Sequence, residues 1–220
     1  MDKIQAIKER HSVRKYIDKP LPEDVIFELQ KEIDEVNKES GLNFQLVTNE
    51  EKCFSGIMSY GKFVNVKNYI ALVGKKSKEL DEQIGYYGER VVIKAGQLGL
   101  NTCWVALSYS KAHTKATVKN NEKLVCVISL GYGENQGVQH KFRPVEKVAK
   151  LSADDPEWYL SGIELARLAP TAINQQKYYI EREGNKVSIS AGVGFYAKVD
   201  LGIVKYHFEV GAKKENFEWK

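Results

Sequence analysis

The stretch Leu124–Leu130, with the sequence LVCVISL, predicts a buried strand at the centre of the fold. It is a short apolar run rich in β-branched residues, and a Gly-Tyr-Gly turn closes it. Such a run is typical of a strand that is covered on both faces. Asn68–Val73 (NYIALV) and Thr102–Leu107 (TCWVAL) have the same character, so we expect two further buried strands there, and a shorter strand over Phe44–Val47.

Helices are predicted around these strands, because apolar residues recur at helical spacing between them. One helix begins at Pro22 and ends at Gly41, and another covers Asp81–Leu98. Asp2 can cap a short helix that precedes both. Strands and helices mix without a regular βαβ rhythm, which favours an α+β fold over a doubly wound parallel sheet.

A second series of elements begins near Asp154. We expect a helix over Glu157–Leu168, a hairpin that turns at Glu183–Lys186 and a last helix that Asp200 opens. PEWYLSGIELARLAP is similar to PEDVIFELQKEIDEVN, and VDLGIVKYHFEVGAKK to EQIGYYGERVVIKAGQLG. These pairs indicate a degenerate internal duplication, or a chance match between amphipathic helices. We predict a first lobe over residues 1–150 and a shortened second lobe over residues 151–220, together one compact unit.

Composition and charge exclude several classes of protein. The 220 residues are 43% hydrophobic and 28% charged, which is ordinary for a globular chain. The net charge of +4 is mild, and 33 basic residues interleave with 29 acidic ones, so no arm for nucleic-acid binding is visible. The N-terminus lacks the apolar stretch of a signal peptide, and no apolar run reaches membrane-spanning length. We therefore expect a cytoplasmic protein that binds neither nucleic acid nor membranes.

The three cysteines, Cys53, Cys103 and Cys126, show no CxxC spacing and no neighbouring histidine cluster. No zinc site and no disulfide framework are therefore expected. Cys103 and Cys126 stand inside apolar runs, where a buried and inert thiol is the ordinary state.

Two basic clusters could hold an anion. The first is RHSVRK at residues 10–15, where guanidinium and hydroxyl donors match the geometry of a phosphate. The second consists of Lys141 and Arg143, which would neutralise the same phosphate from another side if the chain folded back. The alternative for the first cluster is a solvated, charged end of a helix.

Two further segments could contact a planar heterocycle. In Ala169–Gln176 (APTAINQQ), a proline-broken helix exposes backbone groups and short polar side chains for hydrogen bonding. Gly99–Leu107 (GLNTCWVAL) could offer a backbone N–H to the N5 atom of a flavin. Taken alone, the first segment is equally a loop between a helix and a hairpin, and the second a buried strand.

Together, these segments resemble the nitroreductase-like family of FMN-dependent oxidoreductases. RHSVRKY resembles the Arg-x-Ser-x-Arg signature that opens family members, and APTAINQQ resembles their Ala-Pro-Ser-x-x-Asn-x-Gln-Pro stretch. LGLNTCW resembles Leu-Gly-Leu-Gly-Thr-x-Trp, and LGYG followed by KFRP resembles the closing pieces. The resemblance implies a nitroreductase-like α+β fold, with a central, mostly antiparallel sheet flanked by helices.

The resemblance also implies a site in which the flavin carries the chemistry, with no catalytic side chain and no metal. The FMN phosphate would be held by Arg10, Ser12, Lys141 and Arg143, and Arg14 would lie near the pyrimidine edge of the flavin. The isoalloxazine and ribityl groups would be lined by Pro170, Thr171 and Asn174. Backbone near N5 would come from Ala106 and Leu107, and the site would also include Trp104, Val105 and His11, the last as a packed or backbone contact.

Two departures from the family pattern matter. The Ala-Pro-Ser-like piece stands in the shortened second copy, although ordinary members carry it soon after the first signature and build the FMN site across a dimer interface. The resemblance to thermophile-type members therefore implies a fused, intramolecular pseudo-dimer with one complete flavin site. In addition, Ala106 and Leu107 stand where well-studied members often carry Glu-Gly, which puts the donor and substrate contacts in doubt.

The implied activity is that of an NAD(P)H-dependent flavin oxidoreductase. NADH or NADPH would reduce the flavin and leave, and a nitroaromatic, a quinone or a similar electron-poor acceptor would take its place in a ping-pong cycle. The alternatives are a family member with other flavin chemistry, such as reductive dehalogenation or flavin fragmentation, and a non-catalytic flavin-binding module. The expected partners are small molecules, and the chain is expected to be a monomer or a homodimer.

Overall fold

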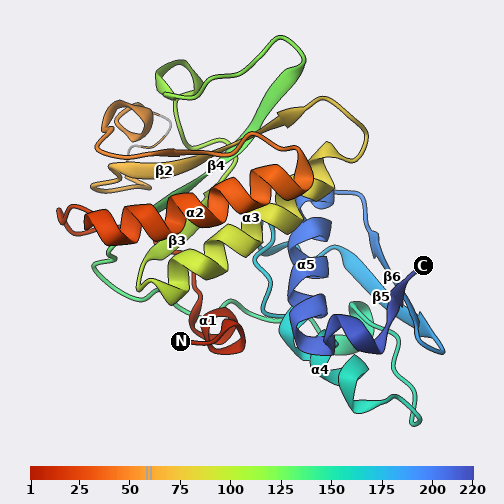
Figure 1. Cartoon of the computed structure of the whole chain (residues 1–220). Coiled ribbons are helices and arrows are strands. Elements are labelled where there is room, and N and C mark those ends of the chain that lie inside the picture. The colour runs from red at the N-terminus through yellow and green to blue at the C-terminus, as the bar shows by residue number, and fades with distance from the viewer. Residues whose placement is uncertain (58, 60) are drawn as a thin grey trace. The chain divides into compact units, whose positions relative to one another are not determined.

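A computed structural model describes residues 1–57, 59 and 61–220 (Figure 1). The chain divides into two compact units. The sheet unit comprises residues 10–80 and 91–139, and the C-terminal unit comprises residues 1–9, 81–90 and 140–220. The division into lobes at residue 150 that the sequence suggests stays a prediction.

The sheet unit is built on an antiparallel sheet of four strands in the order β1-β2-β4-β3. The strands are β1 (Gln45–Val47), β2 (Asn68–Lys75), β3 (Asn101–Val105) and β4 (Glu122–Gly131). β2 and β4 occupy the centre, and nearly all of their residues are buried, as their apolar runs predict. The four predicted strands are confirmed, except that β3 ends at Val105 and leaves Ala106 and Leu107 in a bend. The pairing of β3 with β4 stops at Val105 and Val127, although β4 itself extends to Glu122.

The helix α2 (Glu23–Ser40) also belongs to the sheet unit and begins after Pro22, as predicted. Its residues Leu29, Ile33 and Val36 are fully buried on one face. Gly41 ends the helix in a left-handed conformation, with φ 71°, and donates its N–H to the carbonyl of Asn37. A side chain there would strain the backbone, so glycine is the residue that suits this stop.

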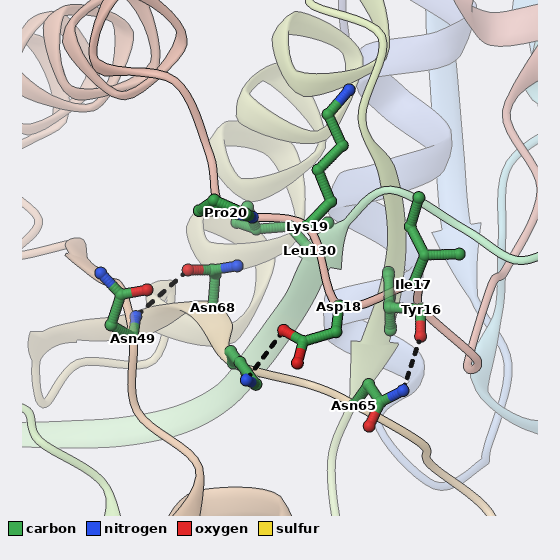
Figure 2. A pocket seen from close by; sticks show the side chains of 11 residues that line it. Tyr16, Ile17, Asp18, Lys19, Pro20, Asn49, Asn65, Asn68 and Leu130 are labelled. Carbon is green, nitrogen blue, oxygen red and sulfur yellow. Dashed lines mark hydrogen bonds and ion pairs between the residues drawn. The ribbon is translucent and has the colours of Figure 1, made fainter.

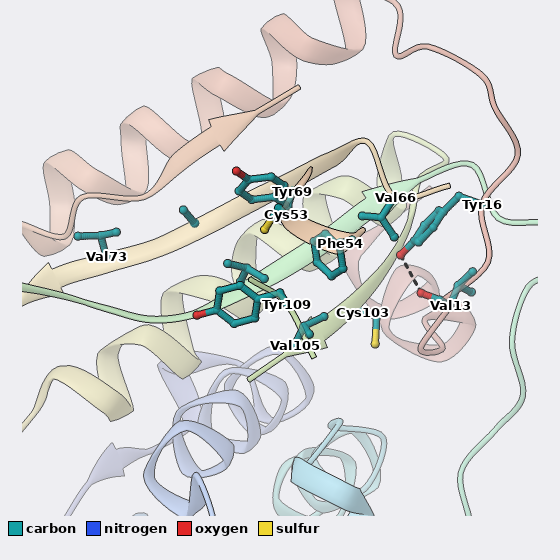
Figure 3. Packing of buried hydrophobic residues seen from close by; sticks show 12 residues of the cluster. Val13, Tyr16, Cys53, Phe54, Val66, Tyr69, Val73, Cys103, Val105 and Tyr109 are labelled. Carbon is teal, nitrogen blue, oxygen red and sulfur yellow. Dashed lines mark hydrogen bonds between the residues drawn. The ribbon is translucent and has the colours of Figure 1, made fainter. Parts of the chain in front are cut away.

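A cluster of buried side chains joins the N-terminal part of the sheet unit to its strands (Figure 3). Tyr16 is 1% exposed, and its hydroxyl donates to the carbonyl of Val13 at 2.7 Å and meets Ser129 Oγ at 2.9 Å. Cys103 and Val105 of β3 belong to the same cluster. This packing fixes the segment that immediately follows the predicted phosphate-binding residues.

The C-terminal unit combines helices with a small sheet. Its elements are α1 (Lys3–Glu9), α4 (Glu157–Ala166), α5 (Ala197–Ala212), the hairpin β5 (Tyr178–Glu183) and β6 (Lys186–Ala191), and β7 (Glu218–Trp219), which pairs with β6 in parallel. The predicted hairpin and first helix are confirmed, and Asp2 accepts from Gln5 N at 2.8 Å. α3 (Leu80–Gln97) contributes residues 81–90 here and the rest to the sheet unit. Short 3₁₀ helices are η1 (Lys52–Phe54), η2 (Lys111–His113), η3 (Val145–Lys147), η4 (Ala172–Asn174) and η5 (Lys214–Asn216).

The prediction that Asp200 opens the last helix is wrong. α5 begins three residues earlier, at Ala197, after Tyr196 in a left-handed conformation. Asp200 therefore lies inside the first turn, where it is 4% exposed. Its carboxylate does not cap its own helix but accepts hydrogen bonds from a different segment, the loop that contains Ala172.

Candidate cofactor-binding site

In the sheet unit, the predicted phosphate-binding segment runs directly beside β3. Ser12 pairs with Thr102 as a parallel bridge, and Val13 N donates to the carbonyl of Thr102 at 3.0 Å. Close by, a Cβ atom on Gly137 would lie 2.7 Å from His11 Cβ, so glycine permits this approach of the two backbones. The structure thus brings together two of the segments that the sequence singles out.

Three residues of this segment influence the pKa of one thiol. Burial raises the pKa of Cys103, while the charge of Arg14, a hydrogen bond with Ser12 and the charge of Arg10 act in the opposite direction. Cys103 is 3% exposed, which confirms its expected burial. The charges of Arg10 and Arg14 and the hydroxyl of Ser12 therefore act on the same residue of β3, and donors of these types match an oxyanion.

The remaining predicted residues of the sheet unit lie along and after the same strand. Trp104 and Val105 are the last residues of β3, and Ala106 and Leu107 follow its end. The Leu107 side chain is 56% exposed. The loop that follows a strand end is a suitable place for a contact to a ligand.

In the C-terminal unit, the predicted residues gather around a glutamine that the sequence reading did not single out. Gln176 is 3% exposed, and its side chain donates to the carbonyl of Lys141 at 2.8 Å and accepts from Arg143 N at 2.9 Å. Its own N–H donates to Thr171 Oγ1 at 3.0 Å. Asn174 Nδ2 also donates to the carbonyl of Lys141, at 3.0 Å. Hydrogen bonds thus join the KFRP and APTAINQQ segments.

The loop that carries Thr171 and Asn174 has an unusual backbone. Ile173, Asn174 and Gln176 adopt positive φ angles of 48°, 55° and 44°. Asparagine tolerates this region, but a β-branched isoleucine does so only under strain. The Ile173 side chain is nevertheless 88% exposed, so its own packing does not explain the conformation.

Asp200 is the second site residue that the sequence reading missed. Its Oδ1 accepts from Ala172 N at 2.9 Å, and its Oδ2 accepts from Gln175 Nε2 at 2.7 Å. Burial raises its pKa to about 6, although both hydrogen bonds act to lower it. Its place in the sequence resembles that of an ordinary residue at a helix start, and no pattern in the sequence signals the contact with the loop.

The sheet unit also contains a separate polar pocket of about 180 Å³ (Figure 2). Asp18, Lys67 and Asn68 are among its lining residues, and none of the predicted cofactor-binding residues is. Lys67 Nζ lies 2.8 Å from Asp18 and 3.0 Å from Glu51, so this cation is already paired within the protein. An ion-paired lysine attracts an anion such as a phosphate less than an unpaired cation does.

Comparison with known proteins identifies the family. Residues 2–212 match the family model described as "Putative TM nitroreductase". The chain belongs to this nitroreductase family. The family covers both units, so neither unit is an unrelated addition. Among curated proteins, nothing matches the chain.

Solved structures related to this nitroreductase family share the fold. A protein of Thermotoga maritima described as "a putative nitroreductase" is 23% identical, with a TM-score of 0.69 over 98% of this chain and 85% of that chain. A "putative nitroreductase in complex with FMN" from Desulfovibrio desulfuricans is 16% identical, with a TM-score of 0.54 over 71% and 98%. A "Putative NADH dehydrogenase/NAD(P)H nitroreductase" of Bacteroides thetaiotaomicron is 20% identical, with a TM-score of 0.53 over 66% and 95%. The predicted nitroreductase-like α+β fold is confirmed.

Two features are absent from residues 1–57, 59 and 61–220. No helix there is long and apolar enough to cross a membrane. No group of three histidine, cysteine or acidic side chains there could hold a metal ion. All three cysteines are free thiols, and all are buried.

Proposed function

We propose that this nitroreductase-family chain binds FMN and uses it to pass electrons from NADH or NADPH to an electron-poor acceptor, such as a nitroaromatic or a quinone. The observation that carries the proposal is the pairing of Ser12 and Val13 with Thr102, which sets the segment of Arg10, Ser12 and Arg14 beside β3. Guanidinium and hydroxyl donors of this kind suit a phosphate. The family match and the FMN complex of the Desulfovibrio neighbour support the same cofactor.

The proposed contacts to the flavin come from several segments of the chain. In the sheet unit, Arg10 and Ser12 would hold the phosphate, and Arg14 would place positive charge near the pyrimidine edge, where it stabilises the reduced, anionic ring. In the C-terminal unit, Lys141 and Arg143 would hold the phosphate as well. Pro170, Thr171 and Asn174 would line the ring and the ribityl chain. After Trp104 and Val105, the backbone of Ala106 and Leu107 would face N5.

When bound, FMN supplies two-electron transfer at its N5 atom. The protein side chains orient the ring, balance its charge and leave one face open for stacking. Donor and acceptor would then use the same open face in turn.

We further propose that the site is complete within one chain. Gly85 of α3 and Gly202 of α5 stand near the heads of the two stretches that resemble each other. A Cβ atom on either glycine would lie 2.0 Å from a backbone oxygen of the other helix, so these two backbones touch. A close pairing of corresponding helices is the arrangement that an internal duplication would produce. A fused pseudo-dimer would account for both sets of site residues in one chain.

Anaerobic titration of the purified protein tests the function. We expect FMN to bind and give the absorbance bands of oxidised flavin, and NADH or NADPH to bleach them. Addition of a nitroaromatic or a quinone should restore the bands. A protein that FMN cannot reconstitute would overturn the cofactor assignment. Bound flavin that neither nicotinamide reduces would instead favour other flavin chemistry or a non-catalytic role.

A further inference from the structure

The loop at residues 171–176 is held in a conformation that its own sequence does not favour. Ile173, Asn174 and Gln176 are left-handed, and left-handed backbone costs a β-branched residue the most. Such strain persists only where surrounding contacts determine the conformation, and it concentrates at ligand-binding sites. The contacts that hold this loop therefore indicate which residues shape the site.

The Asp200 carboxylate forms hydrogen bonds with the residues on both sides of Ile173 and Asn174. One carboxylate oxygen accepts from the backbone N–H of Ala172, which precedes Ile173, and the other accepts from the Gln175 side chain, which follows Asn174. The same Gln175 nitrogen also donates to the carbonyl of Phe195 at 2.7 Å. A single carboxylate thus spans the strained pair and connects it to the start of α5.

Burial of the Asp200 carboxylate costs desolvation free energy, so we expect its contact with the loop to have a functional role. Asp200 is 4% exposed, and it forms no ion pair with any residue that the structure describes. Its two partners, the Ala172 N–H and the Gln175 carboxamide, are neutral donors. A buried carboxylate without a counter-charge is tolerated only when hydrogen bonds replace its hydration, and here the strained loop supplies them.

We infer that Asp200 is a positioning residue, which holds residues 171–176 in the shape that presents Thr171 and Asn174 to the flavin. The inference rests on the proposed FMN site. On the other side of the loop, Gln176 donates to Thr171 and to the carbonyl of Lys141, and Asn174 donates to the same carbonyl. Hydrogen bonds therefore hold the loop from Asp200 on one side and from the KFRP segment on the other. Removal of the negative charge at Asp200 should weaken the hydrogen bonds that hold the loop on the Asp200 side.

The test compares two buried aspartates of the same unit. In Asp200→Asn, the amide nitrogen would face the donor group of Gln175, so one hydrogen bond becomes a donor–donor contact. Asp155→Asn is the matched control. The Asp155 side chain is 3% exposed and accepts from a backbone N–H, that of Ser152, and from a side chain, that of Arg182, but it has no contact with the loop.

Two measurements on both variants decide the outcome. The first is FMN affinity by fluorescence titration, for which we expect Asp200→Asn to bind about tenfold to a hundredfold more weakly, as the loss of a charged hydrogen bond implies. The second is hydrogen exchange of the Ala172 amide in protein without flavin, which should become at least about fivefold faster. Asp155→Asn should change neither quantity.

The inference is overturned if Asp200→Asn leaves Ala172 exchange unchanged, whatever happens to FMN affinity. It is also overturned if Asp155→Asn weakens FMN binding equally, because the effect would then be a general loss of stability. If the wild-type protein binds no FMN, the proposed function fails. In that case, the exchange experiment still shows whether Asp200 holds the loop.

Discussion

Gly85 and Gly202 bring the backbones of α3 and α5 into contact, because a Cβ on Gly202 would lie 2.0 Å from the carbonyl oxygen of Glu82. One side-chain pair continues this contact along the helices, because His207 Nε2 of α5 lies 2.8 Å from Glu89 of α3. The Nδ1 atom of His207 lies 3.0 Å from the carbonyl of Leu165 in α4. Both members of the pair are fully buried. Helix packing at this distance depends on the absence of side chains at the crossing point.

Gly202→Ala should therefore be strongly destabilising. The added methyl group would collide with backbone atoms, which cannot move aside as a flexible side chain can, so the helices would have to separate. We expect a loss of about 2–4 kcal/mol in the free energy of unfolding, measured with urea. Gly56→Ala is the control, since a Cβ there meets nothing within 4 Å. Equal stability of the two variants would contradict the close helix contact.

Tyr16→Phe should weaken the support of the basic segment without removing any proposed flavin contact. The Tyr16 hydroxyl bonds both Val13 and Ser129 in the buried cluster, and burial raises its pKa, so it remains a neutral donor. Its removal leaves a buried carbonyl and a buried hydroxyl with one partner fewer, which should cost about 1–2 kcal/mol of stability. Thermal unfolding measures the loss. A variant as stable as the wild type would show that these bonds do not secure the segment.

Protein stability should depend on pH through Asp200. Its pKa is raised to about 6 in the folded protein, above the ordinary value of 3.8, so the folded state binds this proton more tightly than the unfolded state does. Protonated Asp200 therefore stabilises the folded protein fully below pH 4, and this stabilisation is lost as the pH rises through about 6. We expect Asp200→Asn to abolish this part of the pH dependence, of the order of 2 kcal/mol. Urea unfolding between pH 4 and 7.5 measures it, and parallel profiles for both proteins would refute the assignment.

Apolar patterns predicted the framework of the fold well, because burial decides it. The runs at Asn68–Val73 and Leu124–Leu130 became the central strands, and the helix from Pro22 to Gly41 has its predicted ends. The start of α5 was placed incorrectly, since an aspartate among apolar residues is typical of a helix start, and nothing local announces a left-handed Tyr196.

The candidate site was predictable only where local sequence carries the chemistry. The donors around Arg10 and the loop at Pro170 stand out as polar segments, and the structure gives each of them neighbours among the predicted residues of its own unit. Asp200 was missed because its role comes from a tertiary hydrogen bond to a residue 28 positions away in the chain. Gln176 stands within the APTAINQQ match, but its hydrogen bond with Arg143, 33 positions away, could not be predicted. Such bonds leave no periodic signal in a single sequence.

The central proposal is that Arg10 and Arg143 both bind the phosphate of FMN. The most direct measurement is the affinity of Arg10→Ala and Arg143→Ala for FMN and for riboflavin, which lacks the phosphate. We predict that each variant loses about 1–3 kcal/mol of FMN binding and none of its riboflavin binding. If either variant binds FMN as tightly as the wild type does, the claim is contradicted.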